Sequence, residues 1–595
     1  MRVLPIDPLD RVTGSCYLVH VPESDLRLLV DCGAYQDGLD PEQATRAAFP
    51  FNPKCLQYVL LTHAHFDHCG RLLHLAKAGF AGQVVGTEET LEIVKLSLED
   101  TLRRERDPEL HRAFAELRWR PLSATQWIGR PFSLAPDLFV VAYRSGHILG
   151  AVSIELISGP KEPALRDQQV RVLFSGDIGN NFDHREVQPL LRHVMDPHGP
   201  VDLAFTESTY GAIVRDPVGS SPSSRRVALA EALRDGIARG GPIVIPVFAI
   251  QRAQDVLWDL HLLAAHDPGL LRGVPVLVDA PMALEFNAIL RRGLGRDHQS
   301  PNGKVRPAWL GRHAFTELGL DPASASDLER LRRAIDQLYG LRPAWLDDAD
   351  LDNSVDSGVT PFDRFRPRWW RIEARNRDQL VADSGARIVL ASGGMADFGP
   401  VQHWLARWLE DERATVLFAG YCGRNTLGGK LNDLARLPAA ERERMLEPMK
   451  FLDGTASIRP CDVKASLKIV SGYSAHADQS RLVEWAFPKF RDGTRFAIGK
   501  RLCITHGDSS SRRALKVALE ARAAATQLAV EVRLPRPGAE AIDVASGAPI
   551  DRDEVLGVRR APVVGDSAEH DEREALLRRL AVLEAENAEL RRKAG

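Results

Sequence analysis

A dense group of metal-ligand side chains directly follows a short apolar run near the start of the chain. The segment THAHFDHCG places His63, His65, Asp67 and His68 within six positions. Neutral imidazole and carboxylate groups bind zinc-like ions well, whereas four such groups would be costly to bury without partners. His63 and His65 are two apart, so they leave a strand end on the same side, while Asp67 and His68 can face a second ion. The segment therefore predicts a two-metal hydrolytic site at the end of a strand.

The composition is that of an ordinary globular protein with room for two or more domains: 595 residues, 44% hydrophobic and 26% charged. The formal net charge of -3 provides no overall basic field, so a polyanionic partner must be bound by local positive patches or metal ions. The seven cysteines form no CxxC pair, which favours a reduced, cytoplasmic protein over a disulfide framework. We find neither a signal peptide nor an apolar stretch of membrane-spanning length, so we expect no membrane insertion.

Short β-like runs alternate with helical stretches along most of the chain, which predicts an α/β protein. Several runs end at a polar or glycine-containing turn, and functional groups in open α/β sheets collect just beyond the strand ends. Three of these turns carry further ligand-type side chains: Asp31 in LLVDCG, His147 in SGHILG and Asp177 in FSGDIG. Each alone would be weak evidence, because an aspartate in such a turn usually serves the turn itself.

Together with the histidine cluster, these turns resemble the five-part signature of the metallo-β-lactamase superfamily. The resemblance implies an αββα sandwich that binds two Zn2+ ions per chain. One ion would be held by His63, His65 and His147, the other by Asp67 and His68, and Asp177 would bridge both. Asp31 would lie behind the ligands and orient one of the histidines.

Three later motifs narrow the resemblance: ESTYG at 207–211, GYSAHAD at 472–478 and ITHGD at 504–508. They are similar to motifs A, B and C of the β-CASP nucleases. This branch of the superfamily includes the endonuclease subunit of the cleavage and polyadenylation specificity factor and its bacterial and archaeal relatives. The similarity extends, with gaps, from about residue 12 to about residue 535.

The β-CASP resemblance also implies roles for the motif residues. Glu207 would pair with His476, which would act as the general acid towards the leaving oxygen, and His506 would complete the second metal site. Asp67, Glu207 and His476 are therefore the candidate catalytic residues, since phosphodiester hydrolysis needs an activated water, charge neutralisation and protonation of an alkoxide. The alternative is that motif B forms only a helix N-cap and that Glu207 is a structural partner.

The order of the motifs predicts a discontinuous domain. We expect the metallo-β-lactamase domain at 1–209 and again at 430–550. An inserted α/β β-CASP domain at 210–429 would form a lid, with RNA in the cleft between the two. Residues 293–360 lose the regular α/β alternation, so we expect them to be an elaboration of the insert.

The residue at motif C bears on the substrate. Branches that act on RNA resemble this chain in carrying histidine there, whereas DNA repair nucleases carry valine, so His506 favours RNA, which we expect to be single-stranded. The sequence thus predicts a cytoplasmic, zinc-dependent ribonuclease and leaves endonucleolytic and 5′-exonucleolytic action open. The alternatives are a DNA nuclease of the same family, a small-ester hydrolase and a non-catalytic RNA-processing scaffold.

Candidate substrate contacts lie in two loops of the insert. Arg252 would lie in the first turn of a helix after IVIPVFA, where its charge and free backbone N–H groups suit a phosphate, unless the helix faces solvent. Further candidates are Ser392, the last residue of RIVLAS, and Gly394 in the loop that follows. The chain departs from the family pattern at Gln251, where a glycine is common.

The end of the chain predicts a short coiled coil. After a charged linker at 551–570, the segment 571–595 carries a heptad seam formed by Leu576, Leu580, Leu583, Asn587 and Leu590. With leucine at d, Asn587 takes an a position, which favours a parallel homodimer. Fewer than three heptads are marginal alone, so the alternative is one amphipathic helix that docks on its own domain or on another protein.

Overall fold

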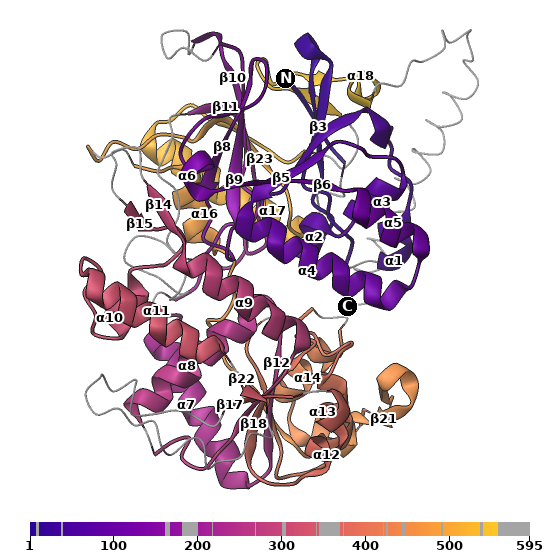
Figure 1. Ribbon diagram of the computed structural model, residues 1–595, viewed down its shortest axis with the longest axis vertical. Coiled ribbons are helices and arrows are strands. Elements are labelled where there is room, and N and C mark those ends of the chain that lie inside the picture. Colours follow the sequence, from indigo (N-terminus) through magenta and orange to yellow (C-terminus); the bar gives the residue numbers. More distant parts are fainter. Residues whose placement is uncertain are drawn as a thin grey trace, which may run out of the picture.

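The structure is a computed structural model with two lobes (Figure 1). It describes residues 1–6, 11–36, 40–160, 167–180, 200–216, 218–267, 269–299, 305–340, 342–343, 369–372, 374–420, 422–423, 426–442, 444–445, 447–489, 492–535 and 540–556. The upper lobe in Figure 1 contains two large mixed sheets, and the lower lobe contains a large parallel sheet.

The two sheets of the upper lobe draw strands from both ends of the chain. In spatial order, the first consists of β26 (Pro549–Ile550), β25 (Ala541–Asp543), β1 (Arg2–Pro5), β2 (Tyr17–Val21), β3 (Leu26–Val30), β4 (Leu56–Leu60), β5 (Gln83–Thr87) and β6 (Arg118–Leu122). The second consists of β24 (Glu531–Arg533), β23 (Gly499–Ile504), β11 (Val201–Thr206), β10 (Val170–Phe174), β9 (Val152–Ser158), β8 (Leu138–Arg144) and β7 (Phe132–Ala135). The upper lobe is therefore discontinuous in sequence.

Aromatic side chains pack the two sheets face to face. The Tyr17 ring on β2 lies 5.1 Å from the rings of both Phe174 on β10 and Phe205 on β11. Strand β8 is buried along its whole length, which explains why its sequence LFVVAYR is almost continuously apolar.

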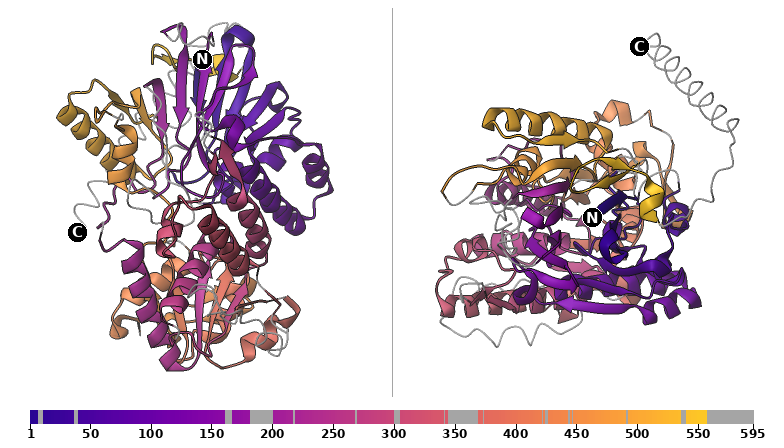
Figure 2. Two further views of the ribbon diagram at one scale, coloured as in Figure 1. Left: turned by 60° about the vertical axis from the view of Figure 1, so that its left-hand side comes forward. Right: turned by 90° about the horizontal axis from the view of Figure 1, so that it is seen from above.

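Helices cover the outer faces of both sheets, on opposite sides in the left view of Figure 2. Helix α4 contacts β5 and β6 of the first sheet, and α17 contacts β23 and β24 of the second, which gives an αββα sandwich. The helices of this lobe are α1 (Pro41–Arg46), α2 (Phe66–Cys69), α3 (Leu72–Lys77), α4 (Glu88–Glu105), α5 (Pro108–Glu116), α6 (Ala124–Trp127), α16 (Gln479–Ala486), α17 (Ser509–Thr526) and α18 (Arg552–Leu556).

All pairings in the large sheet of the lower lobe are parallel. Its order is β16 (Arg342–Pro343), β17 (Trp369–Arg371), β13 (Val276–Asp279), β18 (Arg387–Ser392), β12 (Pro242–Val247), β19 (Thr415–Phe418) and β22 (Ser466–Ile469). The helices of this lobe include α7 (Pro222–Arg239), α8 (Arg252–His266), α9 (Pro281–Gly295), α10 (His313–Glu317), α11 (Ala325–Tyr339), α12 (Ala374–Ala382), α13 (Val401–Trp408), α14 (Leu427–Arg436) and α15 (Ala439–Arg442). Helices α7 and α13 contact β12, the strand between β18 and β19.

The return of the chain to the upper lobe comes later than the expected residue 430. Strand β22 pairs with β19 of the lower sheet along its whole length, and the small hairpin of β20 (Met449–Phe451) and β21 (Ala456–Ile458) packs against α13. We therefore propose that the inserted domain extends to about residue 470, after β22.

Part of the expected elaboration at 293–360 bridges the two lobes. It contains the hairpin of β14 (Asp297–Gln299) and β15 (Val305–Pro307), and β14 contacts α6 of the upper lobe. Nearby, α9 packs against α4, and Arg296 lies 2.7 Å from Glu89 and 2.8 Å from Glu92. Ion pairs therefore join the two lobes where α9 packs against α4.

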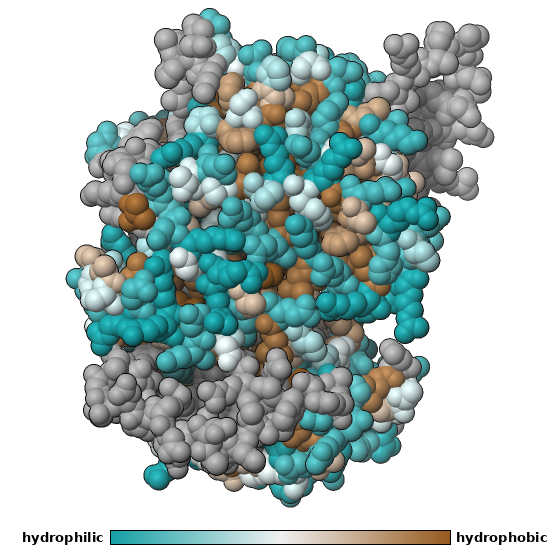
Figure 3. Space-filling model, in the orientation of Figure 1, coloured by the Kyte–Doolittle hydropathy of each residue, from teal (hydrophilic) through white to brown (hydrophobic). Residues whose placement is uncertain are grey.

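Two further sequence predictions concern the C-terminal segment and membrane insertion. The heptad seam and the linker beyond residue 556 lie outside the described residues. Within the described part of the chain, no helix has the length and apolar character needed to cross a membrane. Hydrophilic residues predominate on the face drawn in Figure 3, with smaller apolar patches between them.

Candidate metal centre

The strand ends of the upper lobe bring the predicted ligands to one place. His63, His65, Asp67 and His68 follow β4, with the last two on the short helix α2. The other three come from separate loops: His147 between β8 and β9, Asp177 after β10 and His506 after β23. All seven predicted ligands fall into two groups of converging side chains.

The first group consists of His63, His65, His147 and Asp177. The Nδ1 atom of His65 lies 3.1 Å from Nε2 of His63 and 3.0 Å from Nε2 of His147. Oδ2 of Asp177 lies 3.5 Å from Nε2 of His63 and 3.4 Å from Nε2 of His147. Three imidazole nitrogens and one carboxylate oxygen thus converge, a donor set that zinc prefers.

The second group uses the other oxygen of the same aspartate. Oδ1 of Asp177 lies 3.3 Å from Nε2 of His68 and 3.4 Å from Nε2 of His506. Oδ2 of Asp67 lies 3.8 Å from Nε2 of His68 and 3.7 Å from Nε2 of His506. Asp177 therefore faces both groups, with one carboxylate oxygen directed to each.

Several buried atoms in these groups support the fit to metal ions. His68 Nε2, His506 Nε2 and Asp177 Oδ1 are buried and have no hydrogen-bond partner among the residues that the structure describes. Buried polar atoms in proteins are normally hydrogen-bonded, and leaving them without a partner is costly. Their convergence on a common point is explained if they coordinate ions.

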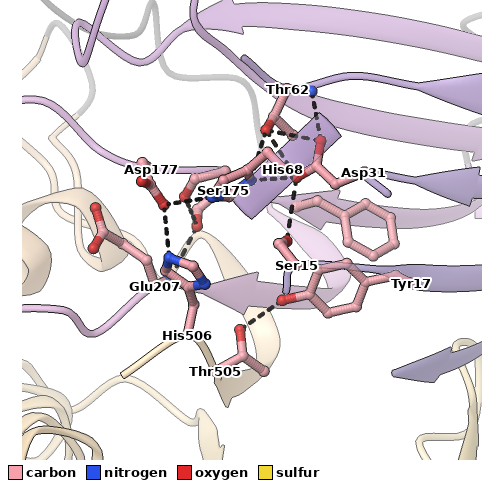
Figure 4. A pocket seen from close by; sticks show the side chains of 12 residues that line it. Ser15, Tyr17, Asp31, Thr62, His68, Ser175, Asp177, Glu207, Thr505 and His506 are labelled. Carbon is pink, nitrogen blue, oxygen red and sulfur yellow. Dashed lines mark hydrogen bonds and ion pairs between the residues drawn. The ribbon is translucent and has the colours of Figure 1, made fainter. Parts of the chain in front are cut away.

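Asp31 lies directly behind the ligands (Figure 4). Its Oδ2 accepts a hydrogen bond from Nδ1 of His68 at 2.7 Å, which leaves Nε2 of that ring to face Asp177. Its Oδ1 accepts a hydrogen bond from the backbone N–H of Thr62 at 2.8 Å, and the Thr62 hydroxyl also donates to it. Because the Thr62 oxygen is then available to accept from Nδ1 of His63, 3.1 Å away, Asp31 fixes two ligand rings.

The titration of the buried histidines follows their surroundings. Burial lowers the pKa of His63 and His147 well below 6.5 and that of His65 to about 4, so these rings are neutral, as metal ligands must be. Burial also opposes protonation of His68, but the charges of Asp177 and Asp31 outweigh it and raise its pKa. The second group therefore attracts positive charge.

The predicted general-acid pair lies beside the first ligand group. Nδ1 of His476 is 3.3 Å from Oε2 of Glu207 and 3.9 Å from Oδ2 of Asp177. Glu207 is buried and also accepts a hydrogen bond from the backbone N–H of Ile178 at 2.5 Å. Burial alone would lower the pKa of His476, but the charges of Glu207 and Asp177 raise it above 6.5. The surrounding carboxylates thus favour the protonated form of His476.

The candidate substrate contacts lie in the lower lobe. Arg252 begins α8, as expected, but its guanidinium donates a hydrogen bond to the carbonyl of Ala419 within the lobe. Ser392 ends β18, and the neighbouring Gly394 packs so closely against Phe248 that a Cβ there would lie 2.9 Å from the Phe248 ring. The role of these three positions in substrate binding stays a prediction.

Sequence reasoning missed several residues that hold the site together. Thr62 lies inside the recognised cluster, so its position was a usable signal. Arg215 donates from Nη1 to the His476 carbonyl at 2.9 Å, and its guanidinium lies 4.8 Å from the Tyr210 ring centroid. Tyr210 in turn lies edge-on to His476, with ring centroids 5.8 Å apart. Nothing in the sequence around Arg215 indicates these contacts.

Comparisons with known proteins identify two domains and several relatives. The model of the metallo-beta-lactamase superfamily matches residues 9–236, and that of the Beta-Casp domain matches residues 253–431. Ribonuclease TTHA0252 of Thermus thermophilus is 27% identical over 89% of this chain and 98% of its own length. Transcription termination factor FttA of Methanothermobacter thermautotrophicus is 25% identical over 85% of this chain and 67% of its own. Integrator complex subunit 11 of Danio rerio is 22% identical over 87% of this chain and 71% of its own.

The two domain matches confirm the predicted fold class, a metallo-β-lactamase domain with an inserted β-CASP domain. Each of the three relatives aligns with at least 85% of the chain, so the similarity extends into both lobes. The chain belongs to the β-CASP family of the metallo-β-lactamase superfamily.

Proposed function

We propose that the protein is a ribonuclease that hydrolyses phosphodiester bonds of single-stranded RNA with two Zn2+ ions per chain. The observation that carries the proposal is that two ligand groups share Asp177 while the Glu207–His476 pair lies beside that same carboxylate. A relative that aligns over 98% of its own length is named a ribonuclease, which supports RNA as the substrate.

The donor sets indicate where the ions would be held. One would be bound by His63, His65, His147 and Asp177, and the other by Asp67, His68 and His506, with Asp177 Oδ1 close to both histidines. When bound, such a pair of ions supplies an activated water and neutralises charge on the phosphoryl oxygens. The histidine-rich donor sets favour zinc over magnesium or calcium, which prefer oxygen ligands.

His476 would supply the proton that the leaving oxygen needs. Its Nδ1 faces Glu207, so Nε2 is the nitrogen left to donate to an alkoxide in the cleft. Glu207 keeps the ring oriented and favours its protonated form. After bond cleavage the neutral imidazole would regain its proton from solvent, because the side chain is 22% exposed.

A direct comparison of substrates tests this function. End-labelled RNA and single-stranded DNA of matched sequence are incubated with zinc-loaded protein, and metal content is measured on the same sample. We expect RNA cleavage that a chelator abolishes. Cleavage of DNA alone would favour the DNA-nuclease alternative. If neither substrate is cleaved and the protein contains no bound metal, the scaffold alternative is favoured.

A circular RNA substrate then distinguishes endonucleolytic from 5′-exonucleolytic action, since a pure exonuclease cannot cut a circle.

We also propose that the protein is cytoplasmic and dimerises through its C-terminal heptad seam. No disulfide joins the seven cysteines, all of which lie among the described residues, and this agrees with a reducing compartment. Deleting residues 568–595 should lower the mass measured by light scattering and leave the metal content unchanged. An unchanged mass would contradict dimerisation through this segment.

A further inference from the structure

A buried ion pair in the lower lobe contacts the start of the loop that carries His476. Arg225 on α7 and Asp259 on α8 are 2% and 0% exposed. The guanidinium binds the carboxylate with two parallel hydrogen bonds, Nε to Oδ2 at 2.6 Å and Nη2 to Oδ1 at 3.1 Å. This bidentate geometry fixes the plane of the guanidinium, and a lysine could not reproduce it.

The remaining side of the guanidinium faces the motif B loop. Nη1 of Arg225 donates to the carbonyl of Gly472 at 3.1 Å, and its guanidinium carbon lies 4.6 Å from the ring centroid of Tyr473. Gly472 has φ of +97°, and a Cβ there would lie 3.3 to 3.5 Å from the Arg225 side chain. The backbone of the loop therefore packs closely against Arg225 at Gly472, which lies four residues before His476.

The other end of the same loop is fixed to the upper lobe. The backbone N–H of Ala477 donates to the carbonyl of Ile178, the residue after Asp177, at 2.8 Å. The His476 carbonyl accepts from Arg215, whose backbone N–H donates to Asp478 at 3.0 Å. The loop thus spans two anchors, one beside the metal ligands and one made by helices of the inserted lobe.

We infer that Arg225, oriented by Asp259, is a positioning residue that places His476 for proton donation. The inference rests on the proposed function and makes the inserted lobe part of the general-acid machinery as well as a cover for the cleft. Arg225 contacts the loop at Gly472 and Tyr473, so we expect it to act on His476 through the path of the loop. Displacing a catalytic group by about 1 Å can cost about a hundredfold in rate.

The leaving group of the substrate separates this role from a merely structural one. RNA releases a ribose alkoxide that must be protonated, whereas bis(p-nitrophenyl) phosphate releases a stable phenolate that needs no proton. For Arg225→Lys we expect kcat on RNA to fall about tenfold to a hundredfold and kcat on the activated ester to fall less than about threefold. Metal content and the KM for RNA should stay unchanged, and His476→Ala should show the same selectivity to a greater degree.

The chain offers a matched control in the same lobe. Arg377 and Asp279 form an equivalent pair, with Nε to Oδ2 at 2.7 Å and Nη2 to Oδ1 at 2.8 Å, and Asp279 also accepts from Trp404. This pair joins α12, β13 and α13 within the lower lobe, so Arg377→Lys should change the two rates by the same factor.

Two outcomes would overturn the inference: equal losses on both substrates in Arg225→Lys, or an unchanged rate on RNA. If Arg225→Lys does not fold, Asp259→Asn keeps the volume and removes the charge, and it is held to the same two criteria. If the wild-type protein cleaves DNA but not RNA, the proposed ribonuclease function fails. DNA also releases an alkoxide, so its comparison with the activated ester then decides the role of Arg225 separately.

Discussion

The metal-ligand groups and the general-acid pair lie side by side but are assembled in different ways. Four proposed ligands come from one short segment of the upper lobe, and Asp31 in the same lobe orients the rings of two of them, His68 and His63. Glu207 and His476 are 269 positions apart, and the His476 loop is anchored to both lobes. We therefore expect metal binding to depend on the geometry of one lobe, and proton donation by His476 to depend on how the two lobes fit. Substitutions in the ligand groups should therefore lower the metal content, whereas substitutions around His476 should lower turnover alone.

The largest effect should come from Asp177, the one residue that both ligand groups share. Asp177→Ala removes a carboxylate oxygen from each group, so we expect less than one bound ion per chain and activity at background. Elemental analysis after dialysis and cleavage of labelled RNA measure the two effects. Retention of two ions would show that Asp177 does not bridge the sites. A thermal unfolding curve in chelator, compared with wild type, checks that the fold is intact.

Removing the general acid should leave the metal groups in place. In His476→Ala we expect two bound ions as in wild type and kcat lowered about 100-fold to 10,000-fold, the usual contribution of general acid catalysis. The comparison with Asp177→Ala is informative because both side chains lie in the same site, yet one change should lose metal and the other only turnover. Full activity in His476→Ala would remove it as the general acid.

The contrast between local segments and contacts across distant segments also explains how much the sequence alone could predict. The ligand set was predictable because each ligand follows a strand end in a short, recognisable turn, and so was the α/β class. The contacts of Arg215 and Arg225 were not predictable, because they depend on tertiary packing between segments more than 240 positions apart. The pairing of β22 with the lower sheet was not predicted, because the sequence of a four-residue strand carries no signal for the sheet that it joins.

Gln251 departs from the family pattern at a position with an unusual backbone conformation. The sequence has glutamine where the family commonly has glycine, and the residue has φ of 69° and ψ of -47°. The N–H of Arg252 donates to the carbonyl of Ile250 at 2.9 Å, so Gln251 is the centre of a strained γ-turn that begins α8. A glycine adopts this conformation more easily. The Gln251 side chain compensates by donating to Asp255 at 2.9 Å.

A smaller effect on the metal side should come from Asp31, which supports ligands without being one. Asp31→Asn weakens the hydrogen bonds to His68 and Thr62, and loss of such a supporting partner typically lowers metal affinity about 10-fold to 100-fold. We expect a chelator competition assay to show this loss and excess zinc to restore most of the RNA cleavage. A wild-type affinity would mean that the packing of the loop, rather than Asp31, orients the rings.

The smallest effect on activity should come from Asp255 in the lower lobe, whose titration should change the folding stability alone. Burial raises the pKa of Asp255, near Arg225, to about 6. Its pKa in the unfolded chain is about 3.9, so between about pH 4 and 6 the unfolded state loses this proton first. Folding stability should therefore fall as pH rises through this window, by up to about 3 kcal/mol, and then level off.

The variant Asp255→Asn removes this titration. Urea unfolding in chelator at pH 4.5 and 7.5 should show that the variant gains stability relative to wild type at the higher pH. An identical pH dependence in both proteins would place the Asp255 pKa near its ordinary value, and a change in metal content would contradict the division between the two regions.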